Sequence, residues 1–262
     1  MLPAFLSILS ANFPMHRTLL FISDLHLSTT DLPTFEAFKQ FMQTCARGAH
    51  GLYVLGDLFE YWIGDDGADA LAEEVAEAFK ELVESGTPVY LIHGNRDFLI
   101  GETWAKQAKV TLLSEPVCIE HEGQMAVLCH GDTFCTDDVS YQQFRALVRN
   151  PDWQAAFLAR PLPDRQAEVL RIRMASQAAK QEKSSEIMDV NLDSVVEMLR
   201  RFPDHQLIHG HTHRPAHHQY DLDLQHRSRW VLPDWYGGQG GYLQWNEKGI
   251  TLKETNINKP PI

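Results

Sequence analysis

The sequence has few cysteines, and their spacing excludes two kinds of protein. Only 4 of the 262 residues are cysteines, and no two of them form a C-x-x-C pair. A disulfide-stapled secreted domain needs more thiols, and a zinc module built on paired cysteines needs them closer together. We therefore expect reduced thiols in a cytosolic protein at Cys45, Cys118, Cys129 and Cys135.

The chain also lacks an excess of positive charge. Lys and Arg number 23 against 35 Asp and Glu, so the formal net charge is −12. Proteins that bind nucleic acid through overall basicity contact phosphates with Lys and Arg. We predict neither a nucleic-acid partner nor an obligate protein partner.

Little in the sequence resembles a targeting signal. The opening stretch, MLPAFLSILSANFP, is apolar but contains Pro3 and Asn12 and lacks a basic beginning. It is also shorter than the roughly 20 residues that a membrane-spanning helix needs. We expect residues 1–15 to be a disordered leader, or Met15 to be the natural start, and residues 16–262 to form a single domain.

Five apolar, β-rich runs share one feature: each ends in polar residues suited to metal or phosphate chemistry. Helical patterns over residues 34–47 and 70–84 separate the first three runs, which predicts an α/β fold with helices covering a sheet. In such folds the ligand crevice lies outside the carboxyl ends of the strands. The runs are LLFISDLH (19–26), GLYVLGD (51–57), PVYLIHGN (88–95), MAVLCHGD (125–132) and QLIHGHTH (206–213).

The region from residue 140 to about 201 has a different pattern, helical and without strand signals. Residues 140–183 carry eight Lys or Arg against four Asp or Glu, so this part of an acidic chain is locally positive. We interpret it as an inserted helical cap. Two later stretches, RWVLPDWY (229–236) and GYLQWNEKGITLKETN (241–256), predict strands, the second as a hairpin that turns near 246–249.

The polar strand ends supply seven oxygen and nitrogen ligands and no sulfur, a set that suits Mn²⁺, Fe²⁺ or Zn²⁺. Each motif alone is weak, because D-L-H arises by chance, G-D often marks only a turn, and H-G-H-T-H-R-P could be a surface histidine cluster. The ordered set at successive strand ends favours a metal site. The predicted metal ligands are Asp24, His26, Asp57, Asn95, His130, His211 and His213.

Seven ligands are more than one tetrahedral ion needs, so the set predicts two ions. If Asp57 bridges, one ion takes Asp24, His26, Asp57 and His213, and the other takes Asp57, Asn95, His130 and His211. Two ions about 3.5–4 Å apart can hold a hydroxide nucleophile and stabilise the attacking and leaving oxygens at phosphorus.

This motif order resembles that of the calcineurin-like metallophosphoesterase superfamily. The resemblance implies an αββα sandwich with a dinuclear metal site. The superfamily normally has G-N-H at the third motif, where the histidine assists the leaving group, whereas this chain has Gly94, Asn95 and Arg96. The superfamily-average mechanism therefore does not transfer directly.

A closer resemblance covers residues 19–215. GDLFEYWIGDD (56–66), HGNRDFLIG (93–101), HGDTFCTDDVSYQQFR (130–145), IMDVN (187–191) and LIHGHTHRP (207–215) are similar to the UDP-2,3-diacylglucosamine diphosphatase family of the lipid A pathway. The resemblance implies two Mn²⁺ ions and attack of metal-bound hydroxide on the α-phosphorus of UDP-2,3-diacylglucosamine. The implied products are UMP and 2,3-diacylglucosamine 1-phosphate, known as lipid X.

The resemblance also implies roles for individual residues. Lys180 stands where the family has Asn, although a lysine can still meet a phosphate or a sugar hydroxyl. The implied catalytic residues are Asp57, Asn95, Arg96 and His211, and the implied substrate contacts are Asn95, Arg96, Asp138, Ser176, Lys180, Lys183 and His211.

The implied substrate carries two acyl chains, which need an apolar groove beside the metals. Aromatic and aliphatic residues of the cap are mostly expected to form a helical core, but some are expected to line this groove. A positive rim also suits anionic lipid headgroups. We therefore expect peripheral association with the cytoplasmic face of the inner membrane, without a spanning segment.

Two other functions remain open from the residues alone. The first is a phosphodiesterase or phosphatase on the same scaffold that acts on a soluble nucleotide or a phosphoprotein. The second is a catalytically inactive scaffold that binds partners. The complete set of seven ligands weighs against the inactive scaffold.

Overall fold

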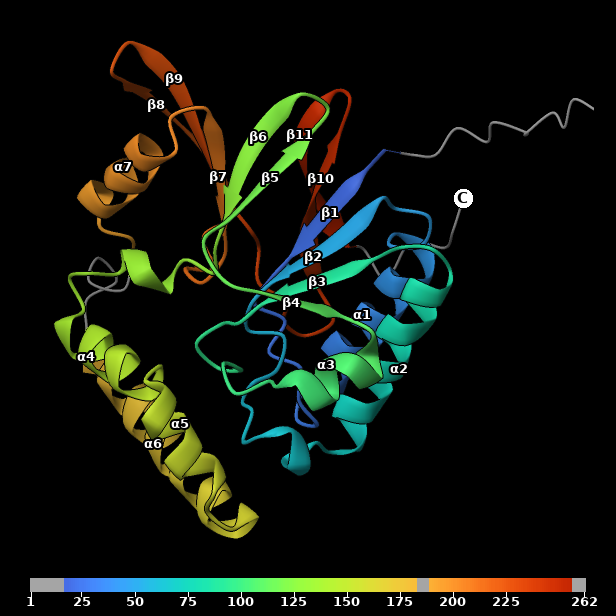
Figure 1. Ribbon diagram of the computed structural model, residues 1–262, viewed down its shortest axis with the longest axis vertical. Coiled ribbons are helices and arrows are strands. Elements are labelled where there is room, and N and C mark those ends of the chain that lie inside the picture. The colour runs from blue at the N-terminus through green and yellow to red at the C-terminus, as the bar shows by residue number, and fades with distance from the viewer. Residues whose placement is uncertain (1–16, 183–188, 256–262) are drawn as a thin grey trace, which may run out of the picture.

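The computed structural model describes residues 17–182 and 189–255, and in these ranges two β-sheets lie face to face with helices on both outer faces (Figure 1). The first sheet has the strand order β11-β10-β1-β2-β3-β4. Strands β1 to β4 are parallel, and β10 and β11 are antiparallel additions at one edge. The strands are β1 (Leu19–Ile22), β2 (Gly51–Leu55), β3 (Val89–Ile92), β4 (Thr111–Leu113), β10 (Gly240–Asn246) and β11 (Gly249–Thr255).

The second sheet has the strand order β5-β6-β7-β9-β8. Its central strands β6, β7 and β9 are parallel, and β5 and β8 pair antiparallel at the edges. All five predicted β-rich runs form strands of one sheet or the other, and the predicted late hairpin is β10 and β11. The strands of this sheet are β5 (Val117–His121), β6 (Gln124–Leu128), β7 (His205–His209), β8 (Ala216–Leu222) and β9 (Gln225–Val231).

Alternation of side chains along the strands explains the layers. In β1, Leu19 and Phe21 enter the core between the two sheets, whereas Leu20 and Ile22 enter the core beneath the helices. In β6, Val127 faces outward and packs with helix α7 (Leu192–Arg201). Because these strands are apolar on both sides, each sheet needs a cover on its outer face. The predicted αββα sandwich is confirmed.

Helices α1 (Leu32–Thr44), α2 (Ala70–Glu84) and α3 (Glu102–Ala108) cover the outer face of the first sheet (Figure 1). Asp31 and Asp69 start α1 and α2, since each side chain accepts a backbone N–H from the first turn. Phe79 of α2 is fully buried and meets Phe38 of α1 edge to face, with ring centroids 5.5 Å apart. The helical layer leaves the carboxyl ends of β1, β2 and β3 uncovered.

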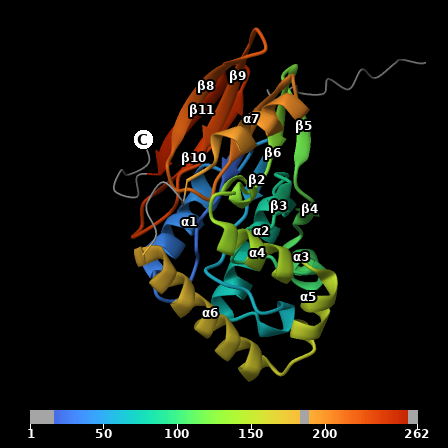
Figure 2. The same cartoon turned by 90° about the vertical axis from the view of Figure 1, so that its left-hand side faces the viewer.

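The predicted insertion contains helices of two kinds. Helices α4 (Val139–Val148), α5 (Pro151–Leu158) and α6 (Leu162–Glu182) lie together beyond the carboxyl ends of β1 to β3 (Figures 1 and 2). In the following, "cap" means these three helices. Helix α7, which the sequence pattern placed in the same insertion, instead packs on the second sheet through Val195 and Leu199.

Arginines hold the cap to the sandwich. Arg145 of α4 donates to Asp132 and Glu115 at 2.7 and 2.9 Å. Arg149, which follows α4, donates to the Gly94 carbonyl at 2.8 Å.

Two further arginines anchor α6. Arg165 is almost completely buried and binds Asp66 and the Ile63 carbonyl. Arg173 binds Glu60. Much of the cap's positive charge is therefore directed inward.

No helix in the described ranges combines the length and the apolar character that crossing a membrane requires. The predicted leader, residues 1–15, lies outside the described residues.

Candidate metal centre

Five of the seven predicted ligands adopt a left-handed backbone conformation. Non-glycine residues rarely do so, because the Cβ atom then crowds the following carbonyl, at roughly 1 kcal/mol per residue. Such strain clusters at functional sites when the surrounding structure enforces it. The five residues and their φ angles are Asp24 (55°), His26 (48°), Asp57 (52°), His211 (70°) and His213 (55°).

Backbone hydrogen bonds hold the loops after β1 and β2 side by side. The Asp24 N–H donates to the Gly56 carbonyl at 3.1 Å, and the His26 N–H donates to the Asp57 carbonyl at 3.0 Å. These bonds continue the parallel pairing of the two strands past their ends. They place Asp24, His26 and Asp57 at one edge of the sheet, as the sequence pattern predicted.

Gly94 allows the loop after β3 to approach this edge. A Cβ atom on Gly94 would collide with both the carboxylate and the backbone nitrogen of Asp57. The approach lets the Arg96 N–H donate to Asp57 Oδ1 at 2.8 Å. Asp97 accepts from the backbone N–H groups of Gly94 and Leu58 at 2.8 and 2.7 Å. Asp97 therefore fixes the two loops to each other.

Asp24, His26 and His213 form one compact group whose ligand atoms lie within 4.8 Å of one another. The Nε2 atoms of the two histidines are 3.3 Å apart, and His213 Nε2 lies 3.4 Å from Asp24 Oδ1. The histidine-rich stretch after β7 thus meets the end of β1, although 187 residues separate His26 from His213.

Asp24, Asp57 and His130 form the second compact group, again within 4.8 Å. The His130 Nδ1–H donates to the Leu55 carbonyl at 2.8 Å, which leaves Nε2 to face Asn95 Oδ1 at 2.9 Å and Asp57 Oδ1 at 3.7 Å. Asp57 Oδ2 lies 3.9 Å from His26 Nε2. Asp57 is therefore placed between the two groups, as a bridging ligand must be, and Asp24 belongs to both.

His211 lies beside the second group without belonging to either compact set. Its ring centroid is 5.0 Å from that of His130, and the Tyr141 ring stacks on it with a centroid distance of 6.0 Å. Its backbone N–H donates to Asp24 Oδ2 at 2.8 Å. Burial and the neighbouring His130 lower the pKa of His211 to about 3, so the imidazole is held in the neutral form that binds metals.

The buried carboxylates create a negative potential in the cluster. Burial by itself lowers the pKa of His130, but Asp57 and Asp24 outweigh it and raise that pKa to about 9. Burial likewise opposes the shift at His213, yet contacts with Asp234 and Asp24 raise its pKa to about 10. Both imidazoles therefore take up protons, which a metal ion displaces when it binds.

Two features show that cations fit this cluster. Asp24 Oδ1 is completely buried and accepts no hydrogen bond from the described residues, which is costly unless a cation meets it. His130 Nδ1–H donates to the Leu55 carbonyl, so Nε2, 2.9 Å from Asn95 Oδ1, carries the second proton of the charged ring and offers a lone pair once a cation displaces that proton. Converging acceptors of this kind suit two divalent ions with oxygen and nitrogen ligands.

Two carboxylates beside the cluster went unrecognised in the sequence. Glu60 Oε2 lies 3.1 Å from His26 Nδ1, and Asp234 Oδ2 lies 3.3 Å from His213 Nδ1. A ligating histidine commonly offers its second nitrogen to a carboxylate. Glu60 lies within the stretch GDLFEYW, but a single acidic residue in a loop has no periodicity to mark it. Asp234 follows β9, in a stretch interpreted only as a strand.

The predicted substrate contacts lie partly on the cap. Asp138 caps α4 by accepting the Tyr141 N–H at 3.0 Å. Ser176 is half-buried on α6. Lys180 belongs to the backbone of α6, but its side chain lies outside the described residues, as does all of Lys183. The structure thus brings the cap helices that carry Asp138 and Ser176 to the side of the metal cluster.

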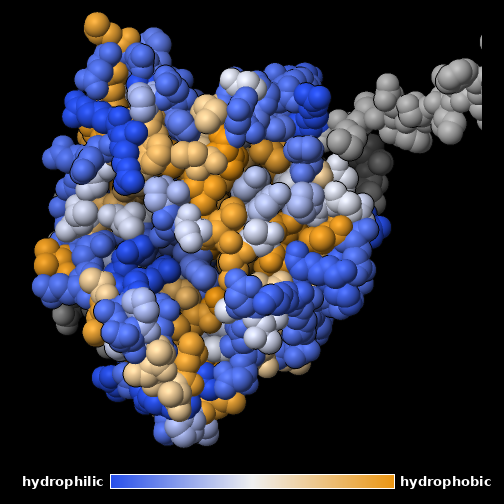
Figure 3. Space-filling model, in the orientation of Figure 1, coloured by the Kyte–Doolittle hydropathy of each residue, from blue (hydrophilic) through white to orange (hydrophobic). Residues whose placement is uncertain are grey.

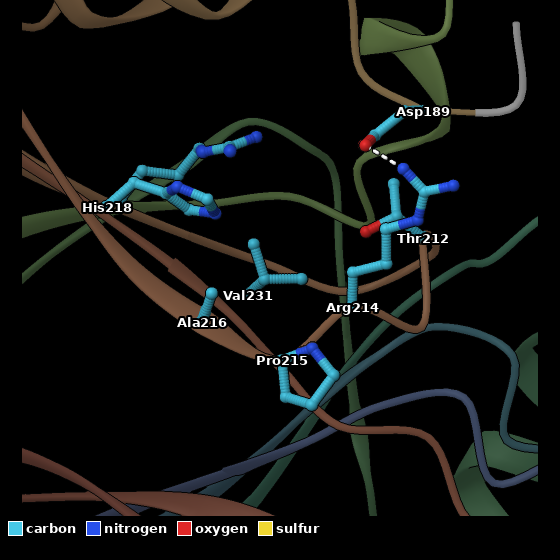
Figure 4. A pocket seen from close by; sticks show the side chains of 8 residues that line it. Asp189, Thr212, Arg214, Pro215, Ala216, His218 and Val231 are labelled. Carbon is cyan, nitrogen blue, oxygen red and sulfur yellow. Dashed lines mark hydrogen bonds and ion pairs between the residues drawn. The ribbon is translucent and has the colours of Figure 1, made fainter. Parts of the chain in front are cut away.

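A shallow pocket of about 240 Å³ adjoins the loop that follows β7 (Figure 4). Thr212 and Arg214 line it, whereas the intervening His213 belongs to the metal cluster. Arg214 pairs with Asp189, which lies beside it on the same side of the pocket (Figure 4). Alternate residues of this loop therefore face the pocket and the metal cluster.

The class of protein follows from this centre and from a comparison of sequences. The family model described as calcineurin-like phosphoesterase matches residues 17–215, which include all seven predicted ligands. The chain belongs to the calcineurin-like phosphoesterases.

Three curated relatives show which family within this class the chain belongs to. A protein of Aromatoleum aromaticum is 49% identical over 230 residues, covering 88% of this chain and 94% of its own length. Proteins of Hahella chejuensis and an Enterobacter species are 47% and 46% identical over 233 residues, covering 89% of this chain and 95% and 97% of their own lengths. All three are named UDP-2,3-diacylglucosamine hydrolase. Within the calcineurin-like phosphoesterases, the chain belongs to the UDP-2,3-diacylglucosamine hydrolase family, which confirms the resemblance found in the sequence.

A Gly94→Ala substitution tests the close approach of the two loops. The added methyl group displaces Asp57, so we expect the affinity for Mn²⁺ to fall about tenfold or more, the size typical of disturbing the support of a ligand. The measurement is the Mn²⁺-induced rise in melting temperature. Gly86→Ala is the control for strain without a clash, since at φ +103° an alanine strains the backbone although nothing lies within 4 Å of the added atom. A Gly94→Ala variant with the full Mn²⁺-induced rise contradicts this account.

Proposed function

We propose that this chain hydrolyses the diphosphate bond of UDP-2,3-diacylglucosamine to UMP and 2,3-diacylglucosamine 1-phosphate in lipid A biosynthesis. The observation that carries the proposal is the buried cluster around Asp24, Asp57 and His130, in a chain 49% identical to a relative named for this hydrolysis. A diphosphate needs cations both to bind its charge and to activate a water, and the cluster collects ligands for them.

The proposed cofactors are two Mn²⁺ ions. Oxygen and nitrogen ligands without sulfur suit this ion. When bound, such a pair supplies a water nucleophile at neutral pH and stabilises charge on the phosphoryl oxygens. In the proposal Asp24, His26, Asp57 and His213 hold one ion, and Asp57, Asn95, His130 and His211 hold the other, with Asp57 shared.

Arg96 is the proposed cation for the substrate's diphosphate. Its backbone N–H binds Asp57, and its guanidinium lies 3.7 Å from Glu60 with about one fifth of the side chain exposed. The side chain thus stands at the rim of the cluster, where its planar fork can bind phosphate oxygens in a bidentate manner. Asn95, Asp138, Ser176, Lys180, Lys183 and His211 are the other proposed contacts.

The leaving group explains why an arginine suits this position. Attack at the α-phosphorus releases a phosphate monoester, whose second pKa is about 6, so it departs as an anion near neutral pH without a proton. An alcohol leaving group needs a proton far more. Charge neutralisation by Arg96 therefore replaces the general acid that a histidine supplies elsewhere in the superfamily.

Hydrolysis in ¹⁸O-labelled water tests the reaction. With Mn²⁺ and UDP-2,3-diacylglucosamine, we expect the label in UMP, because the water oxygen joins the α-phosphorus. Mass spectrometry of both products gives the answer. Label in lipid X, or cleavage only of soluble phosphodiesters, contradicts the proposal. Asp57→Asn and chelation of the metal are the controls, and both are expected to abolish turnover because each removes the shared ligation.

Substitutions of Arg96 test its role. For Arg96→Ala we expect kcat/KM on the native diphosphate to fall by about 10²- to 10³-fold, the usual loss when one donor to a developing charge is removed. Arg96→His should not restore this loss, yet should exceed Arg96→Ala on an alkyl phosphodiester, which needs a proton donor. Arg171→Ala is the control, since Arg171 is exposed and pairs only with Glu168 of the same helix among the described residues. Full native activity of Arg96→His would falsify the idea.

We propose further that the cap docks on the cytoplasmic face of the inner membrane. Six of the eleven exposed large hydrophobic residues in the described ranges lie on α4, α5 and α6. Figure 3 shows hydrophobic patches among polar residues on one face of the molecule. Exposed apolar side chains near positive charge favour an anionic lipid surface. The six are Val139, Leu147, Leu158, Leu162, Leu170 and Met174.

Glutamate on α6 tests membrane docking. Leu170 and Met174 are one helical turn apart and 48% and 72% exposed, so replacing both with Glu places two charges on the apolar surface. We expect this variant to lose sedimentation with vesicles of phosphatidylethanolamine and phosphatidylglycerol. Leu252→Glu, on β11, is the control. Equal loss in the control, or no sedimentation of the unaltered chain, contradicts docking through the cap.

A further inference from the structure

Glu60 lies at the junction of the metal cluster and the cap. It follows Asp57 by three residues, and its backbone N–H donates to the Leu27 carbonyl at 3.2 Å. This bond extends the paired loops after β1 and β2. The side chain is only about one fifth exposed, so the carboxylate is held among neighbours rather than free in solvent.

One oxygen of Glu60 faces a proposed metal ligand. Oε2 lies 3.1 Å from His26 Nδ1, close enough to accept a proton that this nitrogen carries. The other ring nitrogen, Nε2, faces His213 and Asp57 in the cluster. Glu60 therefore contacts the side of the imidazole opposite the metal position.

The other oxygen of Glu60 faces the cap. Oε1 accepts a hydrogen bond of 2.5 Å from Arg173 Nη2 on α6, and Arg96 Nη1 lies 3.7 Å from the same oxygen. The Arg173 guanidinium also lies over the Tyr61 ring, 5.4 Å from its centroid. A guanidinium held by a carboxylate and an aromatic face has little freedom, so the position of α6 depends on that of Glu60.

We propose that Glu60 is a positioning residue that couples the metal centre to the cap: it holds His26 with one oxygen and Arg173 of α6 with the other. The inference rests on the metal centre of the proposed function. If His26 held an ion with Nε2, which faces the cluster, Nδ1 would carry the ring proton toward Glu60 and strengthen that contact and, through it, the anchor of α6. By thermodynamic reciprocity, docking of α6 then favours metal binding.

Asp234 provides a matched comparison within the same chain. Its Oδ2 lies 3.3 Å from His213 Nδ1, so it supports a ligand of the same proposed ion as Glu60 does. Among the salt bridges of the described residues, however, Asp234 pairs only with His213 and has no arginine of the cap. Asp234 thus supports the metal without a link to α6.

Hydrogen exchange of the full chain with and without Mn²⁺ tests the coupling. We expect saturating Mn²⁺ to slow exchange of the α6 amides about fivefold or more, the lower end of typical couplings between sites. Glu60→Gln should abolish this slowing, and Asp234→Asn should retain it. Each variant should weaken Mn²⁺ binding by about 10- to 100-fold, and calorimetric titration fixes the concentration that saturates each one.

Arg173→Gln cuts the same link from the cap and leaves the ligand set intact, so it serves if Glu60→Gln fails to fold. It should lose the slowing in α6 while still binding Mn²⁺.

Three outcomes overturn the coupling: slowing that persists in Glu60→Gln or in Arg173→Gln, slowing that disappears equally in Asp234→Asn, and unaltered protein that binds Mn²⁺ without any change in α6. Absence of Mn²⁺ binding by the unaltered chain is a separate result, which overturns the proposed metal centre itself.

Discussion

The arrangement of the loops around the candidate metal centre depends on two buried carboxylates. Asp24 and Asp57 end adjacent parallel strands with almost no exposure to solvent, and like charges this close repel strongly in a medium of low polarity. The surrounding groups compensate the negative charge of these carboxylates. Backbone N–H groups of Arg96 and His211 bind the carboxylates, and histidines from the loops after β6 and β7 surround them. The arrangement of two sheets is what brings these loops to one edge.

Arginines of the cap compensate further negative charge on the sandwich. The chain as a whole is acidic, and the cap helices α4 and α6 approach the sandwich through arginines. Arg145 meets Asp132 and Glu115, and Arg165 meets Asp66. Local positive charge in residues 140–183 therefore has two uses: part of it fastens the cap to the sandwich, and the proposal assigns the remainder to an anionic surface. The sequence alone does not tell these two uses apart, because both rely on Lys and Arg.

The sequence predicted the strands and the ligand motifs because both have local signals. Apolar runs of strand length mark the sheets, and a polar residue at a strand end is conspicuous. The assignment of α7 to the cap failed to distinguish two helical regions, since an amphipathic helix packs equally well on a sheet or on other helices. Glu60 and Asp234 were missed for a different reason: their importance comes from contacts with His26 and His213, and a long-range contact leaves no local pattern. The shared position of Asp24 in both groups also depends on packing of the loops.

The left-handed backbone at the ligands lowers the stability of the fold. Glycine adopts that conformation freely, so replacing a ligand such as Asp57 or His211 with glycine relieves about 1 kcal/mol of local strain. Five such positions are a sizeable share of the roughly 5–15 kcal/mol by which a domain is stable. Glycine at these positions would thus remove the ligand side chains while relieving the backbone strain. The five strained backbone positions therefore mark residues whose side chains the fold accommodates at a cost in its own stability.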